Sequence, residues 1–167
     1  SLPGYFLGDE WERSAFLREC EHWGEVIRKA SQNITIIFGS IAVDWQNNNE
    51  DGRERKYNAV FVAEDGEFLP HPVTGQNFFS KTLMPNYRAF DDSRHFHDLR
   101  KLALERQLPI EDLLQPVPSR LGKLGCLLCE DGWDQDYKIS PIAQLAAKGA
   151  ELLINLSSSP YTFNKNH

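Results

Sequence analysis

Leu121-Gly122-Lys123-Leu124-Gly125-Cys126-Leu127-Leu128-Cys129-Glu130-Asp131-Gly132-Trp133 is the stretch that decides the fold. Its first half is rich in leucine and glycine, and we predict a buried strand there. The strand ends abruptly at Cys129, where two acids, a glycine and a tryptophan follow. A strand that delivers a thiol to a sharp turn is a common way to present a nucleophile. We therefore predict that Cys129 is a nucleophile.

A strand–helix–strand unit follows from this stretch. Ser140-Pro141 is typical of a helix start, Gly149 of a helix end, and residues 152–156 read as another buried strand. Two strands joined by a helix within about forty residues are expected to be parallel. Their carboxyl ends then lie side by side, so Cys129 should face the Ser157-Ser158-Ser159 segment. Ligands of open α/β sheets bind at this edge.

The first half of the chain predicts one helix and a hairpin. The helix should run from Asp9 to about Ser31, with Asp9 as N-cap and Glu12 completing a capping box. Its apolar stripe is Phe16, Cys20, Trp23, Ile27 and Ala30. We expect strands at 34–43, covered on both faces, and at 57–64, separated by a surface loop at 45–56, with a hairpin turn at Asp65-Gly66.

Two sets of reactive side chains, a lysine and a pair of histidines, lie between the hairpin and the cysteine strand. Lys81 follows Phe78-Phe79-Ser80 at the edge of an apolar segment, and taken alone it reads as a solvent-facing side chain at a strand end. His95-x-His97 could place two imidazoles together, but a metal site needs a third and fourth ligand, which the sequence does not supply at a recognisable spacing. We expect a helix at 97–107 and a surface insertion at 99–114.

Composition narrows the class of protein. The 167 residues suit one compact domain, and a net charge of −6 without a basic stripe argues against nucleic acid as a partner. The longest apolar run, near residues 34–43, is too short to span a bilayer, and no leader precedes it, so no membrane partner is expected. Three cysteines indicate a reducing compartment with thiols, which predicts a cytoplasmic protein.

The Cys126-x-x-Cys129 spacing also has a redox or zinc interpretation. Residues three apart on a strand point to opposite faces, so the two thiols could not share a metal or close an easy disulfide. We read Cys126 as core. An inert Cys129 is disfavoured by the acids that follow it, because unpaired carboxylates are costly to bury and a buried strand end is therefore unlikely.

Two segments of the chain are informative together, Lys81-Thr-Leu-Met-Pro-Asn-Tyr-Arg-Ala-Phe-Asp-Asp-Ser-Arg-His-Phe and Leu-Leu-Cys129-Glu-Asp-Gly-Trp. They resemble the nitrilase (carbon–nitrogen hydrolase) superfamily, and within it the glutaminase domain of glutamine-dependent NAD synthetases. Leu2-Pro-Gly-Tyr5 and Ile154-Asn-Leu-Ser-Ser-Ser-Pro160 agree in order and spacing. The resemblance implies an α/β fold, the nitrilase-like αββα sandwich, and a glutamine amidohydrolase that supplies ammonia for NAD synthesis.

The resemblance also implies roles for residues. In a Glu-Lys-Cys triad, Cys129 would form a thioester, and Lys81 with the backbone N–H of Glu130 would stabilise the oxyanion. Asp92 falls where relatives often carry a second glutamate beside the lysine. Positions expected to bind substrate are Tyr87, Phe90, Ser157, Ser158 and Ser159.

The resemblance places the general base, a glutamate, just before Leu2-Pro-Gly-Tyr5. We therefore expect residues 1–167 to be a partial glutaminase domain that lacks its first strand, its base and its C-terminal part, and so to be inactive alone. No cofactor or metal is expected for the glutaminase reaction, whereas ATP and Mg would belong to a missing synthetase domain. Expected partners are glutamine, that synthetase domain or subunit, and further copies in a homo-oligomer. The alternatives are a free-standing amidase or nitrilase and a non-catalytic interaction module.

Overall fold

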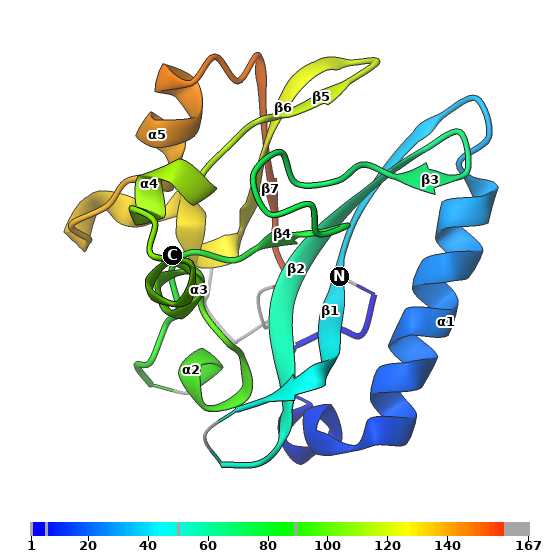
Figure 1. The fold of residues 1–167 in the computed structure, drawn as a ribbon, viewed down its shortest axis with the longest axis vertical. Coiled ribbons are helices and arrows are strands. Elements are labelled where there is room, and N and C mark those ends of the chain that lie inside the picture. The colour runs from blue at the N-terminus through cyan, green and yellow to red at the C-terminus, as the bar shows by residue number, and fades with distance from the viewer. Residues whose placement is uncertain (1, 6, 50, 89, 159–167) are drawn as a thin grey trace, which may run out of the picture.

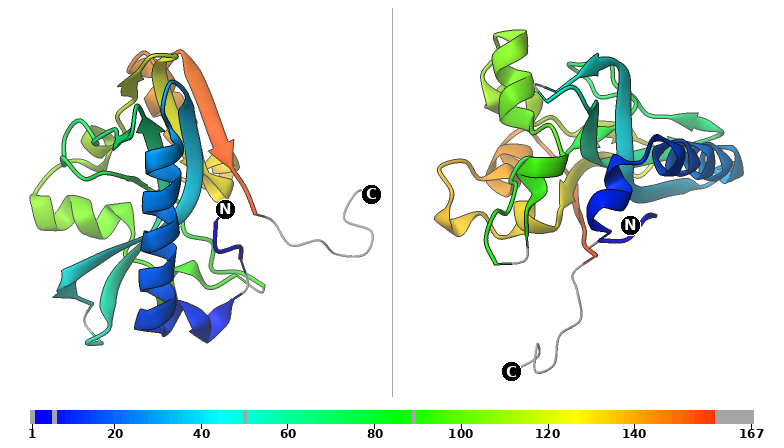
Figure 2. Two further views of the ribbon diagram at one scale, coloured as in Figure 1. Left: turned by 90° about the vertical axis from the view of Figure 1, so that its right-hand side faces the viewer. Right: turned by 90° about the horizontal axis from the view of Figure 1, so that it is seen from below.

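The structure, a computed structural model, describes residues 2–5, 7–49, 51–88 and 90–158. Two β-sheets face each other at its centre. Helix α1 (Ser14–Ala30) covers one sheet and helix α5 (Pro141–Ala147) covers the other (Figure 1). The second view from below shows the same order of layers, helix, sheet, sheet and helix (Figure 2). The predicted αββα layering is thus present.

The first sheet is built on a long hairpin. It contains β1 (Thr35–Asn48), β2 (Glu54–Glu64), β3 (Glu67–Phe68) and β4 (Phe79–Ser80). β1 and β2 are antiparallel, with Thr35 opposite Glu64 and an irregularity between Asp44 and Asn48. The prediction of a surface loop at 45–56 holds only for the tip of the hairpin, because β1 runs to Asn48 and β2 begins at Glu54; Lys56 is fully buried, and Trp45 packs against a core cluster.

The predicted turn between β2 and β3 is confirmed. Asp65 and Gly66 connect the two antiparallel strands, and both have positive φ angles, 49° and 83°. Such angles are required at both central positions of the turn that best matches the twist of a two-residue hairpin.

The second sheet carries the strand that ends at the cysteine. It has the order β5 (Val117–Ser119), β6 (Gly122–Leu128) and β7 (Leu152–Leu156), with β5 antiparallel and β7 parallel to β6. The predicted βαβ unit is confirmed, and the Ser140 side chain caps α5 by accepting from the Ala143 N–H. The prediction that β7 is buried was wrong, since Leu152 and Leu153 are exposed.

The core lies between the two sheets. Apolar side chains from β2, β4, β5 and β6 pack together there: Val60, Val62, Phe79, Val117, Leu124 and Leu128. Each sheet therefore buries one face against the other. This packing fixes the distance between the end of β4, which precedes Lys81, and the end of β6, which precedes Cys129.

The N-terminal helix differs from its prediction. Gly8–Glu12 forms a separate 3₁₀ turn, η1, and α1 starts only after Arg13, which is extended. Asp9 therefore does not cap α1, and Glu12 completes no capping box; Glu12 instead accepts hydrogen bonds from Lys56 and His95. The stripe is also displaced: Trp23 is 49% exposed, and the buried positions of α1 are Leu17, Cys20 and Gly24.

The segment expected to be a surface insertion has its own small core. It contains α3 (Leu99–Arg106) and α4 (Ile110–Leu113), and α2 (Asp92–His95) precedes it. Five side chains from this segment are buried against one another: Leu99, Leu102, Ala103, Leu113 and Leu114. The helix predicted at 97–107 is present as α3, and the segment packs largely on itself, as a surface insertion would. Among the described residues, no helix is long and apolar enough to cross a membrane.

Two glycine substitutions test this packing. A Cβ at Gly125 on β6 would lie 2.6 Å from Leu153 Cδ2 and 3.2 Å from Ala150 Cβ, whereas one at Gly24 on α1 would meet only Phe38 at 3.9 Å. We expect Gly125→Ala to lower the free energy of unfolding by about 1–3 kcal/mol through overpacking. Gly24→Ala should raise it by about 0.5–1 kcal/mol through helix propensity. Urea unfolding measures both, and a neutral Gly125→Ala would contradict the β6–β7 packing.

Candidate active site

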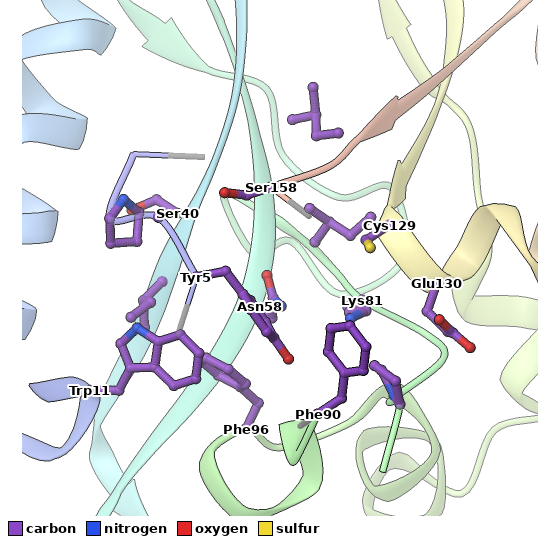
Figure 3. A pocket seen from close by; sticks show the side chains of 16 residues that line it. Tyr5, Trp11, Ser40, Asn58, Lys81, Phe90, Phe96, Cys129, Glu130 and Ser158 are labelled. Atoms are coloured by element: carbon purple, nitrogen blue, oxygen red, sulfur yellow. The ribbon is translucent and has the colours of Figure 1, made fainter. Parts of the chain in front are cut away.

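A pocket opens at the carboxyl ends of β6 and β7, where ligand binding was expected. It brings together five of the predicted residues, Lys81, Phe90, Cys129, Glu130 and Ser158 (Figure 3). Five further lining side chains had been given no role from the sequence: Tyr5, Trp11, Ser40, Asn58 and Phe96. The pocket therefore draws on both sheets and on the N-terminal segment.

Cys129 sits in a sharp turn at the end of β6. Its φ is +45°, a left-handed angle that is uncommon for a residue with a side chain. It opens the 3₁₀ turn η2 (Cys129–Gly132), and its carbonyl accepts a hydrogen bond from Asn155 Nδ2 of β7 at 3.2 Å. The strand and the turn together present the Cys129 side chain to the pocket, as the sequence predicted for a nucleophile.

Lys81 is buried, with 2% of its surface exposed, so the interpretation as a solvent-facing lysine was wrong. Its backbone N–H donates to the Asn58 carbonyl at 2.8 Å, which fixes it beside β2 just after β4. Its Nζ donates to Asp92 Oδ2 at 2.5 Å, and Asp92 is completely buried. Asp92 is thus the carboxylate partner of this lysine.

Tyr5 ties the N-terminal segment to the same ion pair. Its hydroxyl donates to Asp92 Oδ1. Burial, together with the negative charge of Asp92, raises the pKa of Tyr5 well above its ordinary value, so the phenol stays protonated. Lys81 and Tyr5 therefore occupy the two oxygens of one buried carboxylate.

Asp131 joins the two halves of the pocket. Its carboxylate accepts from the backbone N–H groups of Thr82 at 3.1 Å, Leu83 at 2.7 Å and Leu128 at 3.1 Å. The first two donors follow Lys81 and the third precedes Cys129. This one side chain thereby fixes the lysine segment against the cysteine turn, a role that the sequence analysis missed.

Both acids after Cys129 are buried, contrary to the expectation that they would resist burial. They are not unpaired: besides the Asp131 contacts, Glu130 accepts from Tyr87 Oη at 2.9 Å and from Tyr137 Oη at 2.8 Å. Burial and the Glu130 carboxylate raise the pKa of both phenols. Both carboxylates are therefore held in fixed positions beside Cys129.

The remaining residues predicted to bind substrate differ in whether they reach the pocket. Tyr87 is 47% exposed, and its ring lies edge-on to Phe90 with centroids 5.4 Å apart, so it contacts the pocket through Phe90 and Glu130. Ser158 lines the pocket, Ser157 is exposed at the end of β7, and Ser159 lies outside the described residues. Their binding roles stay predictions.

The alternative sites suggested by the sequence are not assembled. Cys126 packs against the core, where burial raises its pKa to about 12, while Cys129 lines the pocket. His95 contacts Glu12, and His97 packs edge-on against Tyr57, so the two imidazoles have separate surroundings. Across residues 2–5, 7–49, 51–88 and 90–158, no three His, Cys, Asp or Glu side chains gather as a metal site.

Two buried polar atoms in the pocket wall lack a hydrogen-bond partner within the described part of the chain. They are the indole N–H of Trp11 and the hydroxyl of Ser40. A buried donor without an acceptor costs about 1–3 kcal/mol. The wall opposite Cys129 is therefore suited to receive a polar group (Figure 3).

The titration of Asp131 offers a test of its position. Burial, opposed by the three N–H donors and the Lys81 charge, raises its pKa to about 6. The folded-state value lies above the value of about 3.9 for an unfolded chain, so its contribution to stability is complete below about pH 4 and is lost as the pH rises through 6. The free energy of unfolding of the unmodified chain minus that of Asp131→Asn should fall by roughly 2 kcal/mol between pH 4 and pH 7.

Urea unfolding at several pH values measures this difference. Asp136→Asn, which removes an exposed carboxylate from the nearby turn η3 (Asp134–Asp136), is the control for losing one charge. A difference between the unmodified chain and Asp131→Asn that stays constant with pH would contradict the buried, clamped carboxylate.

Comparison with known proteins identifies related chains. The glutamine-dependent NAD(+) synthetase of Thermotoga maritima is 32% identical over 167 residues, and that of Aquifex aeolicus is 32% identical over 165 residues. The matches include 98% and 99% of this chain but 24% of each relative, so the chain spans about a quarter of the length of these relatives. No family model matches the chain.

Solved structures agree in fold. The glutamine-dependent NAD+ synthetase of Acinetobacter baumannii, solved with ADP, superposes with a TM-score of 0.64 at 26% identity, over 97% of this chain and 25% of that one. A carbon–nitrogen hydrolase from Helicobacter pylori gives 0.57 at 22% identity, over 93% and 45% of the two chains, which is a likeness of fold alone. The resemblance drawn from the sequence, and the nitrilase-like fold with it, are confirmed.

Proposed function

We propose that this chain, related along nearly its whole length to glutamine-dependent NAD(+) synthetases, is part of a glutaminase domain that releases ammonia from glutamine. The observation that carries the proposal is a buried lysine and a cysteine in a strained turn lining one pocket. Burying the charged form of a lysine costs free energy unless a negative charge lies nearby. Asp92 supplies one such charge, and the oxyanion that develops during the reaction would supply a second.

The reaction would run through a thioester. The Cys129 sulfur attacks the carboxamide carbon, and the carbonyl oxygen takes the negative charge, which Lys81 and the backbone N–H of Glu130 stabilise. The C–N bond then breaks, and the nitrogen leaves as ammonia with the proton that the general base took from the thiol. Water, activated by the same base, hydrolyses the thioester to glutamate.

The general base is proposed to be a glutamate that is not among residues 1–167. Asp92 already accepts from Lys81 and Tyr5, and Glu130 from two tyrosines, so neither carboxylate is well placed to take the thiol proton. The Trp11 N–H and the Ser40 hydroxyl, which have no partner among the described residues, are compatible with an incoming carboxylate. ATP and Mg are assigned to a synthetase domain outside this chain, which would use the ammonia, and assembly into oligomers belongs to the same proposal.

The cysteine pair tests the nucleophile. In the full-length protein we expect Cys129→Ala to reduce ammonia release from glutamine by about 10⁴-fold or more, because no thioester forms. NAD synthesis from free ammonia should continue at the unmodified rate. Cys126→Ala, a substitution in the core three residues away, should lower stability and keep glutaminase activity.

Two outcomes would contradict the proposed chemistry. Glutaminase activity retained in Cys129→Ala would exclude the thioester. Failure of a diazo-ketone analogue of glutamine to label Cys129 in the full-length protein would instead favour a non-catalytic module. Ammonia release from other small amides but not from glutamine would indicate a free-standing amidase or nitrilase.

The Glu130 side chain tests the substrate class. Its carboxylate lines the pocket and is held by Tyr87 and Tyr137, so we expect it to bind the α-ammonium of an amino-acid amide. Glu130→Gln keeps an acceptor for both phenols but removes the charge, and should raise KM for glutamine about 10–100-fold with kcat changed by less than about threefold. Glu111→Gln on α4 is the surface control. An unchanged KM would show that Glu130 does not recognise the ammonium group.

A further inference from the structure

The Trp11 ring forms part of the wall of the Cys129 pocket, on the side away from the thiol (Figure 3). The side chain is 5% exposed and comes from η1, the turn that precedes α1. The proposed reaction gives this ring no role. A large, nearly buried ring at the edge of a ligand pocket determines how far the pocket extends, because no substrate atom can enter the volume that the ring occupies.

Three other rings hold Trp11 in place. The ring centroids of His95, Phe96 and Tyr5 lie 5.1, 5.2 and 5.4 Å from that of Trp11. Two of these contacts, with His95 and Tyr5, are edge-on, an arrangement that aromatic pairs favour. The indole therefore loses three contacts if it rotates away from the pocket.

The backbone beside Trp11 is fixed by a buried ionic cluster around Glu12. The Glu12 carboxylate accepts from the fully buried Lys56 of β2 and from His95 Nδ1 of α2 at 2.6 Å, and Arg53 Nη1 lies 3.0 Å from it. Burial alone would raise the pKa of Glu12, but the hydrogen bonds from Lys56 and His95 outweigh burial and lower it, so the carboxylate stays charged. The turn that carries Trp11 is thus tied to the first sheet and to α2, which makes the wall rigid.

The space that this wall leaves is small. The cavity has a volume of about 60 Å³, and at about 10–15 Å³ for each water it holds roughly four to six water molecules. A carboxamide and the first methylenes of an unbranched chain need about this much room. A branched or aromatic amide needs more, and Trp11 stands where the extra atoms would have to go.

From this packing we propose that Trp11 is a specificity-determining residue, which restricts the pocket to narrow, unbranched carboxamides such as the side chain of glutamine. The inference rests on the proposed function, because it takes the pocket to be the place where a carboxamide meets Cys129. A smaller side chain at position 11 would extend the cavity toward Phe96 and His95 and admit bulkier amides. In a tightly packed pocket, even one additional methylene changes discrimination by about tenfold or more.

Alkylation of Cys129 in the full-length protein measures this size limit without requiring turnover. Iodoacetamide is itself a small primary amide, whereas N-phenyl iodoacetamide carries the same reactive group on a bulky one, and mass spectrometry of the Cys129 peptide gives both rate constants. The ratio of the two rates cancels any change in the reactivity of the thiol. We expect Trp11→Leu to raise the relative rate of the phenyl reagent by about tenfold, and Trp11→Phe, which keeps a ring in the cluster, by about threefold.

Trp23→Leu is the matched control. It removes the same atoms from a tryptophan of α1 that is 49% exposed, and should leave the ratio within about twofold. Thermal unfolding confirms that each variant is folded. A ratio that is unchanged in Trp11→Phe and Trp11→Leu would overturn the inference, and so would an equal rise in Trp23→Leu. Neither result bears on the proposed function, since alkylation uses no glutamine and the loss of ammonia release in Cys129→Ala is measured separately.

Discussion

The geometry of the pocket depends on the carboxylate of Asp131. It accepts three backbone N–H groups, two from the segment after Lys81 and one from the end of β6. Thr82 and Leu83 lie in the loop that follows β4 of the first sheet, and Leu128 ends β6 of the second, so the carboxylate satisfies backbone donors that no strand pairing satisfies. The Tyr87 hydroxyl adds a second polar link between the same two segments through Glu130, but it comes from an exposed side chain, whereas the Asp131 contacts are buried.

The ion pair of Lys81 and Asp92 adds a second constraint of a different kind. Both side chains are buried, and a buried pair contributes little net stability because removing two charges from water is costly. Its main effect is on position, because the Lys81 ammonium and the Asp92 carboxylate must stay in contact to remain buried. The Tyr5 hydroxyl donates to the second oxygen of the carboxylate. The Lys81 side of the pocket is thus fixed by contacts within the protein.

Much of this fold could be predicted from local signals. The strand that ends at Cys129, the Ser140 cap, the parallel β7 and the Asp65-Gly66 turn all lie in short segments whose residue types have few alternative conformations. The proximity of Lys81 to Cys129 came from the resemblance rather than from pattern. The layered architecture came from that resemblance as well.

The errors have a common physical cause. Glu12 has the spacing of a capping residue, yet Lys56 and His95, more than forty residues away, determine its conformation. The residues at 45–56 look like a loop because several are charged, but distant carboxylates pair with them: Lys56 with Glu12, 44 positions away, and Arg55 with Glu105, 50 positions away. The roles of Asp131 and Tyr5 depend on distant partners, which a single sequence does not reveal.

The separation of these contacts along the chain has a consequence for the order of folding. Cys129 and β7 are joined by a local βαβ unit, whereas the bond from Tyr5 to Asp92 spans 87 positions and the Asp131 clamp spans 49. Contacts between distant residues form late, because closing a long loop costs entropy before any bond is gained. A half-folded chain should therefore form the Cys129 turn before Lys81 and Asp92 are in place beside it, and the complete pocket would form only late in folding.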